Sequence, residues 1–150
     1  MNIEKFLFAS SAYVYSSSGS FYKDTKQSCE QIIESYSKLG KIDYTILRYG
    51  SLYGERSDFR NSLFKIVSSA LKFNKIDYYG NGDEIREFIH VNDAARLSLQ
   101  AVNDNYNGQI LMLTGKKSIK YIDLMNVIKE IIGKDIKINL HPNKSDTHYR

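Results

Sequence analysis

The 150-residue sequence predicts an α/β protein with a mainly parallel sheet. Short runs rich in β-branched and aromatic residues alternate with amphipathic stretches of ten or more residues, a pattern typical of strands joined by helices. Glycines supply natural helix stops, as at Gly40 and Gly133. With 42% hydrophobic and 25% charged residues, the composition is ordinary for one domain with a real core.

The first predicted elements are a strand, a helix and a second strand. The segment Lys5–Tyr15 contains FLFASSAYVY and predicts a buried strand that ends near Ser10 or Ser11, followed by a serine-rich loop. Residues 22–39 carry apolar side chains at helical spacing. Residues 43–49, DYTILRY, predict the next strand.

The rest of the chain continues this alternation. The predicted helices cover residues 61–73, 92–102 and 118–132, and their caps include Asn92 or Asp93 and Ser118. The predicted strands cover residues 75–79, 87–91, 109–113 and 135–140, and the predicted loop and turn cover residues 50–60 and 80–82. No linker, repeat or low-complexity tract divides the chain, so we expect a single domain over residues 1–150.

Composition narrows the classes of function. The net charge is +4, but the lysines are scattered beside Asp or Glu, which favours a solvated surface over a nucleic-acid interface. No apolar run is long enough to span a membrane, and no secretory pattern opens the chain. The single cysteine, Cys29, fits a reducing compartment. We therefore expect a cytoplasmic protein with no membrane partner, no nucleic-acid partner and no metal site.

A tyrosine and a lysine stand four residues apart in YKDTK, residues 22–26. On a helix, Tyr22 and Lys26 share one face, where an ammonium favours the phenolate form of a nearby phenol. Such a tyrosine can remove a proton from a sugar or alcohol hydroxyl near neutral pH. Ser11, expected at the carboxyl end of the preceding strand, could hydrogen-bond the same oxygen. Considered alone, however, the pair is more often a surface contact of a helix.

Four motifs occur in order along the chain. They are SSAYVY (residues 10–15), YKDTK with Glu30 four residues later, LRYGSLYGE (residues 47–55) and YYGNGDEIREFIHVNDAA (residues 78–95). This series resembles the extended short-chain dehydrogenase/reductase family, in its branch of NAD-dependent sugar-nucleotide epimerases and dehydratases. The resemblance implies a partial Rossmann-like parallel sheet with helices, plus a small C-terminal substrate-binding part.

The resemblance also implies a catalytic and cofactor-binding set. Ser11 resembles the family's catalytic serine or threonine, Tyr22 its base and Lys26 the lysine that also holds the nicotinamide ribose. The implied cofactor is NAD, with NADP as the alternative. Its implied contacts are Ser10, Tyr22, Lys26 and Tyr49.

The implied substrate is a nucleotide sugar, bound by Ser11, Ser51 and Arg86. Arg86 matches the arginine that grips the diphosphate, and a planar guanidinium suits that task because it pairs with two phosphate oxygens at once. Considered without the family, an ion pair of Arg86 with Asp83 or Glu87 is the better interpretation.

The implied reaction is a transient oxidation of the sugar. NAD accepts a hydride from a sugar carbon while Tyr22 takes the hydroxyl proton, and the keto intermediate is then reduced on its other face or loses water. Arg48 would stand with Tyr49 at a strand end near the nicotinamide. His90 would be structural and Asp93 would cap a helix.

The sequence departs from the family in three places. It has no Gly-x-x-Gly-x-x-Gly turn for a pyrophosphate, the segment from Ser11 to Tyr22 is short, and Ser51 stands where an asparagine is usual. The chain thus looks like the C-terminal portion of an epimerase, a single truncated domain. Because a truncated sheet exposes an edge, we expect a homo-oligomer or completion by another polypeptide. A non-catalytic remnant is the alternative function.

Overall fold

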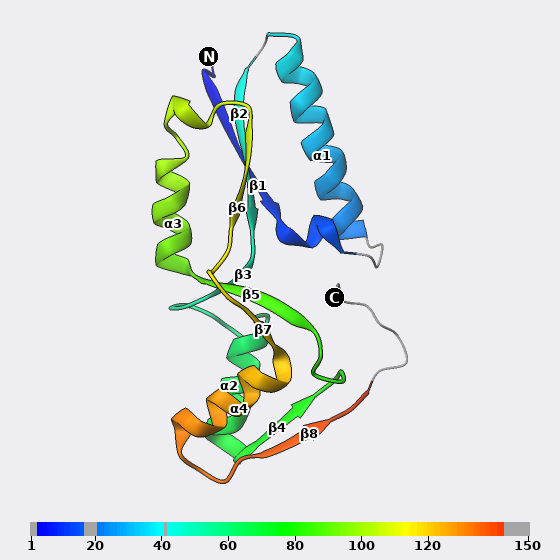
Figure 1. Ribbon diagram of the computed structural model, residues 1–150, viewed down its shortest axis with the longest axis vertical. Coiled ribbons are helices and arrows are strands. Elements are labelled where there is room, and N and C mark those ends of the chain that lie inside the picture. The colour runs from blue at the N-terminus through cyan, green and yellow to red at the C-terminus, as the bar shows by residue number, and fades with distance from the viewer. Residues whose placement is uncertain (1–2, 17–20, 41, 143–150) are drawn as a thin grey trace.

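The computed structural model describes residues 3–16, 21–40 and 42–142, and it confirms the α/β class (Figure 1). The strands are β1 (Lys5–Ser11), β2 (Asp43–Tyr49), β3 (Ser51–Tyr53), β4 (Lys75–Tyr78), β5 (Ile85–His90), β6 (Gln109–Leu113), β7 (Ser118–Lys120) and β8 (Lys137–Leu140). The helices are α1 (Phe21–Lys38), α2 (Ser62–Phe73), α3 (Val91–Gln100) and α4 (Tyr121–Ile132), with the 3-10 helices η1 (Ala12–Tyr15) and η2 (Asp104–Tyr106). Most of the predicted serine-rich loop, residues 17–20, lies outside the described residues.

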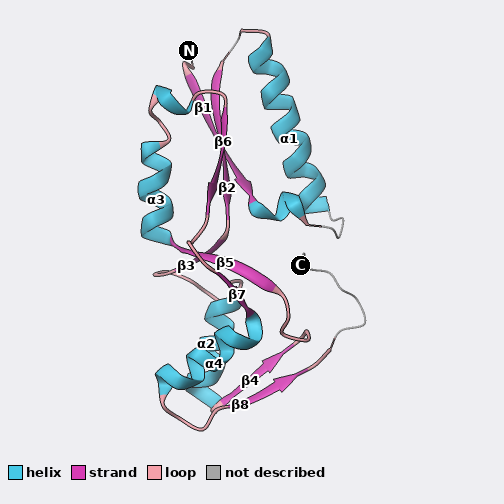
Figure 2. Cartoon of the chain, in the orientation of Figure 1, coloured by secondary structure: helices cyan, strands magenta, loops and turns pink. Residues whose placement is uncertain are grey.

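The first part of the molecule is a parallel sheet in the order β1-β2-β6. Helix α1 lies on one side of this sheet and α3 on the other (Figure 2). Because both faces are covered at β2, neighbouring side chains of this strand are buried together, as Ile46 and Leu47 show. In the described part of the chain β1 pairs only with β2, so its other edge is open.

Helix α3 is held by an apolar cluster on its side of the sheet. Leu47 of β2 and Leu113 of β6 pack with Ala94 and Ala101, and Ile89 of β5 completes the buried set. The small side chains of Ala94 in α3 and of Ala101 at its C-cap let the helix approach the strands closely, and Leu97 of α3 packs against the same cluster. This packing sets the position of the strand ends.

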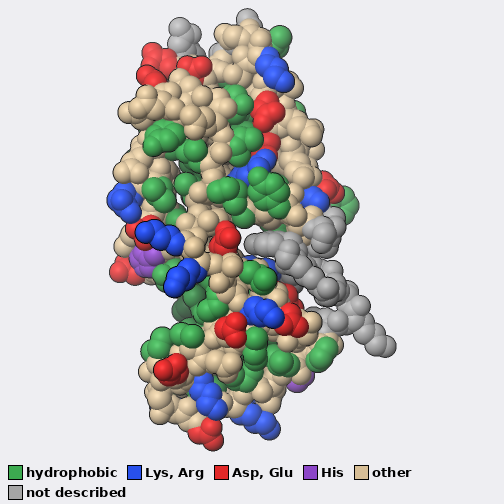
Figure 3. Space-filling view, viewed as in Figure 1, with side chains coloured by type: hydrophobic (Ala, Val, Ile, Leu, Met, Phe, Trp, Pro, Cys, Tyr) green, Lys and Arg blue, Asp and Glu red, His purple; other side chains and the backbone are tan. Residues whose placement is uncertain are grey.

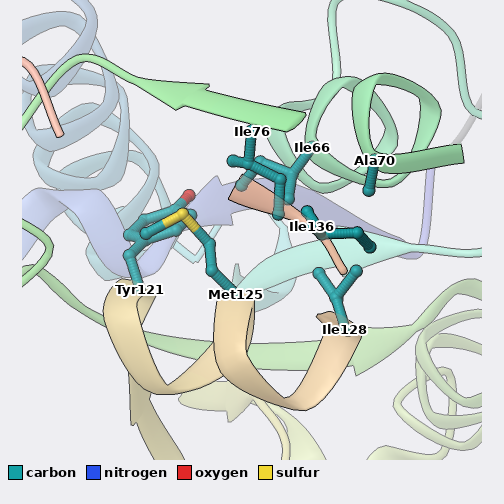
Figure 4. Close-up of a cluster of buried hydrophobic side chains, with 7 residues drawn as sticks. All are labelled: Ile66, Ala70, Ile76, Tyr121, Met125, Ile128 and Ile136. Atoms are coloured by element: carbon teal, nitrogen blue, oxygen red, sulfur yellow. The ribbon is translucent and has the colours of Figure 1, made fainter. Parts of the chain in front are cut away.

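The second part of the molecule has its own core between α2, α4 and the strand pair β4-β8 (Figure 4). Ile66 and Ala70 of α2 face Met125 and Ile128 of α4, and Ile76 of β4 fills the space beside them. Amphipathic helical spacing places these side chains on one face of each helix. Strand β5 connects this part to the first, pairing in parallel with β3 and antiparallel with β7.

Two short strands were not predicted. Strand β3 lies within the predicted loop 50–60, and its residue Ser51 pairs with Phe88 of β5. Strand β7 begins at Ser118, which pairs with Glu87, so the prediction that Ser118 caps a helix is wrong. Strands of three residues carry too little periodicity to be recognised, since pairing with β5 alone defines them.

The helix starts also differ in detail from the prediction. The cap of α3 is His90, whose Nδ1 accepts a hydrogen bond from the backbone N–H of Asn92 at 3.2 Å. Asp93 lies in the first turn and pairs with Arg96 instead of capping the helix. Helix α4 begins three residues later than predicted, at Tyr121, and ends as predicted at Gly133, whose φ of 67° suits a residue without a Cβ.

Charged side chains of both signs are interspersed over the face of the molecule in Figure 3. That face therefore shows no broad area of a single charge, which agrees with the scattered lysines of the sequence. None of the helices in the described residues is both long and apolar enough to cross a lipid bilayer.

The core of the second part gives a first prediction. Met125 is fully buried between α2 and α4, so Met125→Ala should lower the free energy of unfolding by about 2–5 kcal/mol, through lost contacts and a cavity. Ile131 on the same helix is 78% exposed, and Ile131→Ala should change this energy by less than about 0.5 kcal/mol. Urea unfolding measures both. Equal losses for the two variants would contradict the packing described.

Candidate functional site

The site is built on the carboxyl ends of two parallel strands. In the register of β1 and β2, Ser11 lies directly opposite Tyr49, and each is the last residue of its strand. Strands that run in parallel end at the same edge of a sheet, where ligands gather in open α/β folds. The chain then turns away in η1 after β1 and in β3 after β2, which leaves space above the strand ends.

Ser11 is fixed by the turn that follows it. It caps η1, and its Oγ accepts a hydrogen bond from the backbone N–H of Tyr13 at 3.1 Å. A hydroxyl that accepts in this way still has its own hydrogen to donate. The geometry therefore leaves Ser11 able to donate a hydrogen bond to a bound oxygen.

Helix α1 supplies Tyr22 and Lys26 from its first two turns. The Lys26 Nζ lies 5.9 Å from the centre of the Tyr22 ring and donates a hydrogen bond to the carbonyl oxygen of Ala9 at 2.8 Å. It also lies 4.9 Å from the centre of the Phe8 ring. Lys26 thus ties α1 to β1, and its ammonium group stays beside the tyrosine as the spacing predicted.

A cavity of about 490 Å³ gathers most of the predicted residues. Its lining includes Ser11, Tyr22, Tyr49, Ser51 and Arg86, which come from five different elements of the fold. The remaining lining residues are Tyr13, Gly50, Ser62, Tyr78, Tyr79 and Tyr121. The cavity therefore opens between the first and second parts of the molecule.

Three of the predicted residues, Ser10, Lys26 and Arg48, are not part of the cavity lining. Ser10 is buried, and its hydroxyl donates a hydrogen bond to Glu30. Lys26 contacts the backbone of β1 as described above. Arg48, predicted near the nicotinamide, turns toward α1 and forms a buried ion pair with Glu30.

Arg86 forms part of the opposite wall. It is 7% exposed, its guanidinium carbon lies 5.5 Å from the centre of the Tyr121 ring, and its Nη1 donates to the carbonyl oxygen of Ile85 at 2.8 Å. Asp83, one alternative partner for this arginine, forms an ion pair with Lys120 instead. The position of Arg86 in the cavity lining is thus compatible with binding an anion.

Sequence reasoning did not identify the aromatic part of this wall. The rings of Tyr78 and Tyr121 lie 4.9 Å apart, although the residues are far apart in the sequence. Burial, and then the charge of Glu84, raise the pKa of Tyr78, so this phenol stays protonated. The tyrosine pair before Gly80 was a visible signal, but only tertiary folding places it opposite Ser11.

The Glu30–Arg48 pair behind the cavity has a defined charge state. Burial by itself raises the pKa of the Glu30 carboxyl, but hydrogen bonds from Arg48 and Ser10, together with the charge of Arg48, outweigh it and hold this pKa below its ordinary value. The hydrogen bond to Glu30 likewise raises the pKa of Arg48. Both groups are therefore charged at neutral pH.

Comparison with known proteins decides the family. The family model for the NAD dependent epimerase/dehydratase family matches residues 1–112 of the chain. This protein belongs to that family. A putative UDP-glucose 4-epimerase of Methanocaldococcus jannaschii is 33% identical over 107 residues, which cover 69% of this chain and 34% of that protein.

Solved structures of epimerases share this fold. The UDP-N-acetylglucosamine 4-epimerase from Methanobrevibacter ruminantium, in complex with UDP-N-acetylmuramic acid, matches with a TM-score of 0.82 and 25% identity over 98% of this chain and 53% of that one. The UDP-glucuronic acid 4-epimerase from Bacillus cereus, in complex with UDP-glucuronic acid and NAD, matches with a TM-score of 0.83 and 25% identity over 95% and 50%. The chain of this epimerase/dehydratase-family protein thus spans only about a third to a half of the relatives that it matches.

The buried ion pair predicts a pH dependence of stability. Because the pKa of Glu30 is lower in the folded state than its ordinary value of 4.5, the pair stabilises the fold fully above about pH 4.5 and loses this effect as the pH falls through the folded-state pKa. Glu30→Gln should cost about 2–3 kcal/mol at pH 7, and this cost should shrink as the pH falls below 4.5 toward the lowered folded-state pKa of Glu30.

Urea unfolding of the parent and of Glu30→Gln, between pH 7 and pH 3, measures this difference. A cost that stays the same across the whole range would show that the Glu30 carboxylate is not the stabilising form.

Proposed function

We propose that this chain provides the sugar-binding and proton-transfer part of an NAD-dependent nucleotide-sugar epimerase or dehydratase. The observation that carries the proposal is that Ser11 and Tyr22 line one side of the cavity and Arg86 lines the other side of the same cavity. The family membership and the UDP-sugars named for the solved relatives support the substrate class. A hydroxyl, a phenol and a guanidinium in one cavity suit a ligand with a sugar at one end and a diphosphate at the other.

The proposed proton transfer uses the first wall. Tyr22 would take the proton from a sugar hydroxyl, and Lys26, 5.9 Å from the ring centre, would stabilise the phenolate that accepts it. Ser11, whose Oγ already accepts from the backbone, would donate its hydrogen to the same sugar oxygen and fix its position. Tyr22 would give the proton back to the sugar oxygen in the return step, while Ser11 keeps its hydrogen bond to that oxygen.

The residues present fit one end of a nicotinamide cofactor. The ammonium of Lys26 and the phenol of Tyr22 lie together at the helix start, a donor pair suited to ribose hydroxyls, and Tyr49 stands at the end of the neighbouring strand. When bound, NAD supplies the acceptor and donor of the hydride. Lys26 and Tyr22 would hold its ribose, and Tyr49 would border the nicotinamide.

The dinucleotide phosphate would need a further portion of protein. The motifs of this chain contain no glycine-rich phosphate turn, and β1 has an open edge in the described residues. We propose that this edge pairs with a strand of a nucleotide-binding portion, in the same or another polypeptide, or that the chain forms an oligomer with itself. A monodisperse monomer in light scattering, with a single cooperative melt, would count against this part of the proposal.

The function itself is tested by titrating the chain with UDP-glucose and, separately, with NAD in a calorimeter. Binding of UDP-glucose is expected with or without NAD binding, because its diphosphate would be held by Arg86, which is not among the proposed contacts of NAD. Absence of UDP-glucose binding at millimolar concentration would contradict the proposal. Binding of UDP-glucose without NAD would limit the chain to the sugar-binding part of the enzyme.

The diphosphate role of Arg86 gives a sharper prediction. Arg86→Gln should weaken UDP binding by about 10- to 100-fold, since it removes charge-assisted hydrogen bonds to phosphate. Arg60 is a matched control, because it is an exposed arginine engaged with Asp58 away from the cavity lining. Arg60→Gln should leave the dissociation constant within about twofold. Similar losses in both variants would assign the effect to net charge alone.

A further inference from the structure

A buried polar cluster lies behind the cavity and joins three elements. The Glu30 side chain of α1 accepts a hydrogen bond from the Ser10 hydroxyl of β1, from Arg48 Nε of β2 at 3.0 Å and from Arg48 Nη2 at 2.5 Å. Glu30 is 4% exposed, so water does not supply these partners. One carboxylate therefore holds α1 against the ends of both strands.

Each anchor of this cluster is adjacent to a residue of the cavity. Ser10 precedes Ser11 on β1, and Arg48 precedes Tyr49 on β2. Neighbouring side chains of a strand point to opposite faces, so Ser10 and Arg48 reach α1 while Ser11 and Tyr49 reach the cavity. Glu30 itself follows Lys26 by one helical turn on the same face of α1.

The cluster continues into the turn after β1. Arg48 Nη1 donates a hydrogen bond to the phenol oxygen of Tyr15, the last residue of η1. Tyr13, in the same turn, has its ring centre 6.1 Å from that of Tyr22 on α1. The distance between these two cavity tyrosines thus depends on how α1 is held against β1 and η1.

We propose that Glu30 is a positioning residue, which sets the arrangement of Ser11, Tyr22 and Tyr49 through its bonds to Ser10 and Arg48. This inference rests on the proposed function for its meaning in sugar binding. Neither Glu30 nor Arg48 lines the cavity, so neither touches the ligand there. A carboxylate suits the task because it accepts several hydrogen bonds at once and fixes the guanidinium with two of them.

The first test separates the sugar end of the ligand from its phosphate end. UDP reports on the wall of Arg86, and the gain in affinity from UDP to UDP-glucose reports on the wall of Ser11 and Tyr22. In Glu30→Gln the dissociation constant of UDP should stay within about twofold, while the gain from the glucose should shrink by about tenfold, the worth of one or two hydrogen bonds.

Thr45→Val is the matched control. Thr45 is fully buried on β2, but its Oγ1 donates to the carbonyl oxygen of Tyr106 at 2.8 Å, away from the strand end that borders the cavity. This substitution should destabilise the fold. It should leave unchanged the gain in affinity from UDP to UDP-glucose, which we call the glucose gain. A glucose gain that falls equally in Thr45→Val, or that stays intact in Glu30→Gln, would overturn the proposal.

A double variant distinguishes positioning from stability. In Glu30→Leu/Arg48→Met both charges are gone, so no unpaired ion is left buried and the free energy of unfolding should recover relative to Glu30→Gln. The directional bonds to Ser10 and Tyr15 are lost with the charges. The glucose gain of the double variant should therefore remain about tenfold below that of the parent. If the glucose gain recovered along with the free energy of unfolding, the role of Glu30 would be purely structural.

A ligand-free measurement keeps the test decisive. The nuclear Overhauser effect between the rings of Tyr13 and Tyr22 should weaken several-fold in Glu30→Gln and persist in Thr45→Val, because only the first weakens the hydrogen bonds that hold α1 to the strand ends. An unchanged effect in Glu30→Gln would contradict the positioning role. If the parent chain binds neither UDP nor UDP-glucose, the proposed function fails, and this measurement still decides what Glu30 positions.

Discussion

A buried carboxylate must find partners for its charge and its oxygens, and Glu30 finds them on the two strands that end at the cavity. The resulting constraint fixes helix α1 relative to the edge where Ser11 and Tyr49 stand side by side. Hydrophobic packing alone would allow α1 to slide or rotate, because apolar contacts are not directional. The directional bonds of Glu30 to Ser10 and Arg48, together with the hydrogen bond of Lys26 to the carbonyl oxygen of Ala9, restrict that freedom.

The cavity depends on a second constraint, the separation of two cores. One apolar cluster holds α3 to the parallel sheet, and the other joins α2, α4 and the strand pair β4-β8. The cavity opens between these clusters, with Ser11 and Tyr22 on one side and Arg86 and Tyr121 on the other. Among the described residues, the cavity thus lies between two walls that come from different parts of the fold.

Family membership places this arrangement in context. The solved relatives include epimerases in complex with UDP-sugars and NAD, and this chain matches about half of each of them. In the proposed function the polar groups of the cavity hold a sugar and a diphosphate, whereas a dinucleotide needs a phosphate-binding turn that the motifs of this chain do not contain. The division of roles proposed above follows from that difference.

The sequence by itself determined the α/β class, most helices and strands, and the family, because these depend on local periodicity and on motifs that run along the chain. It placed Tyr22 beside Lys26, since helical spacing fixes that relation locally. Only the tertiary structure decided that Arg48 turns away to Glu30, that His90 caps α3, and that Tyr78 and Tyr121 face Ser11 across a cavity. These relations join residues far apart in the sequence or depend on which face of a strand is covered, and no local pattern records them.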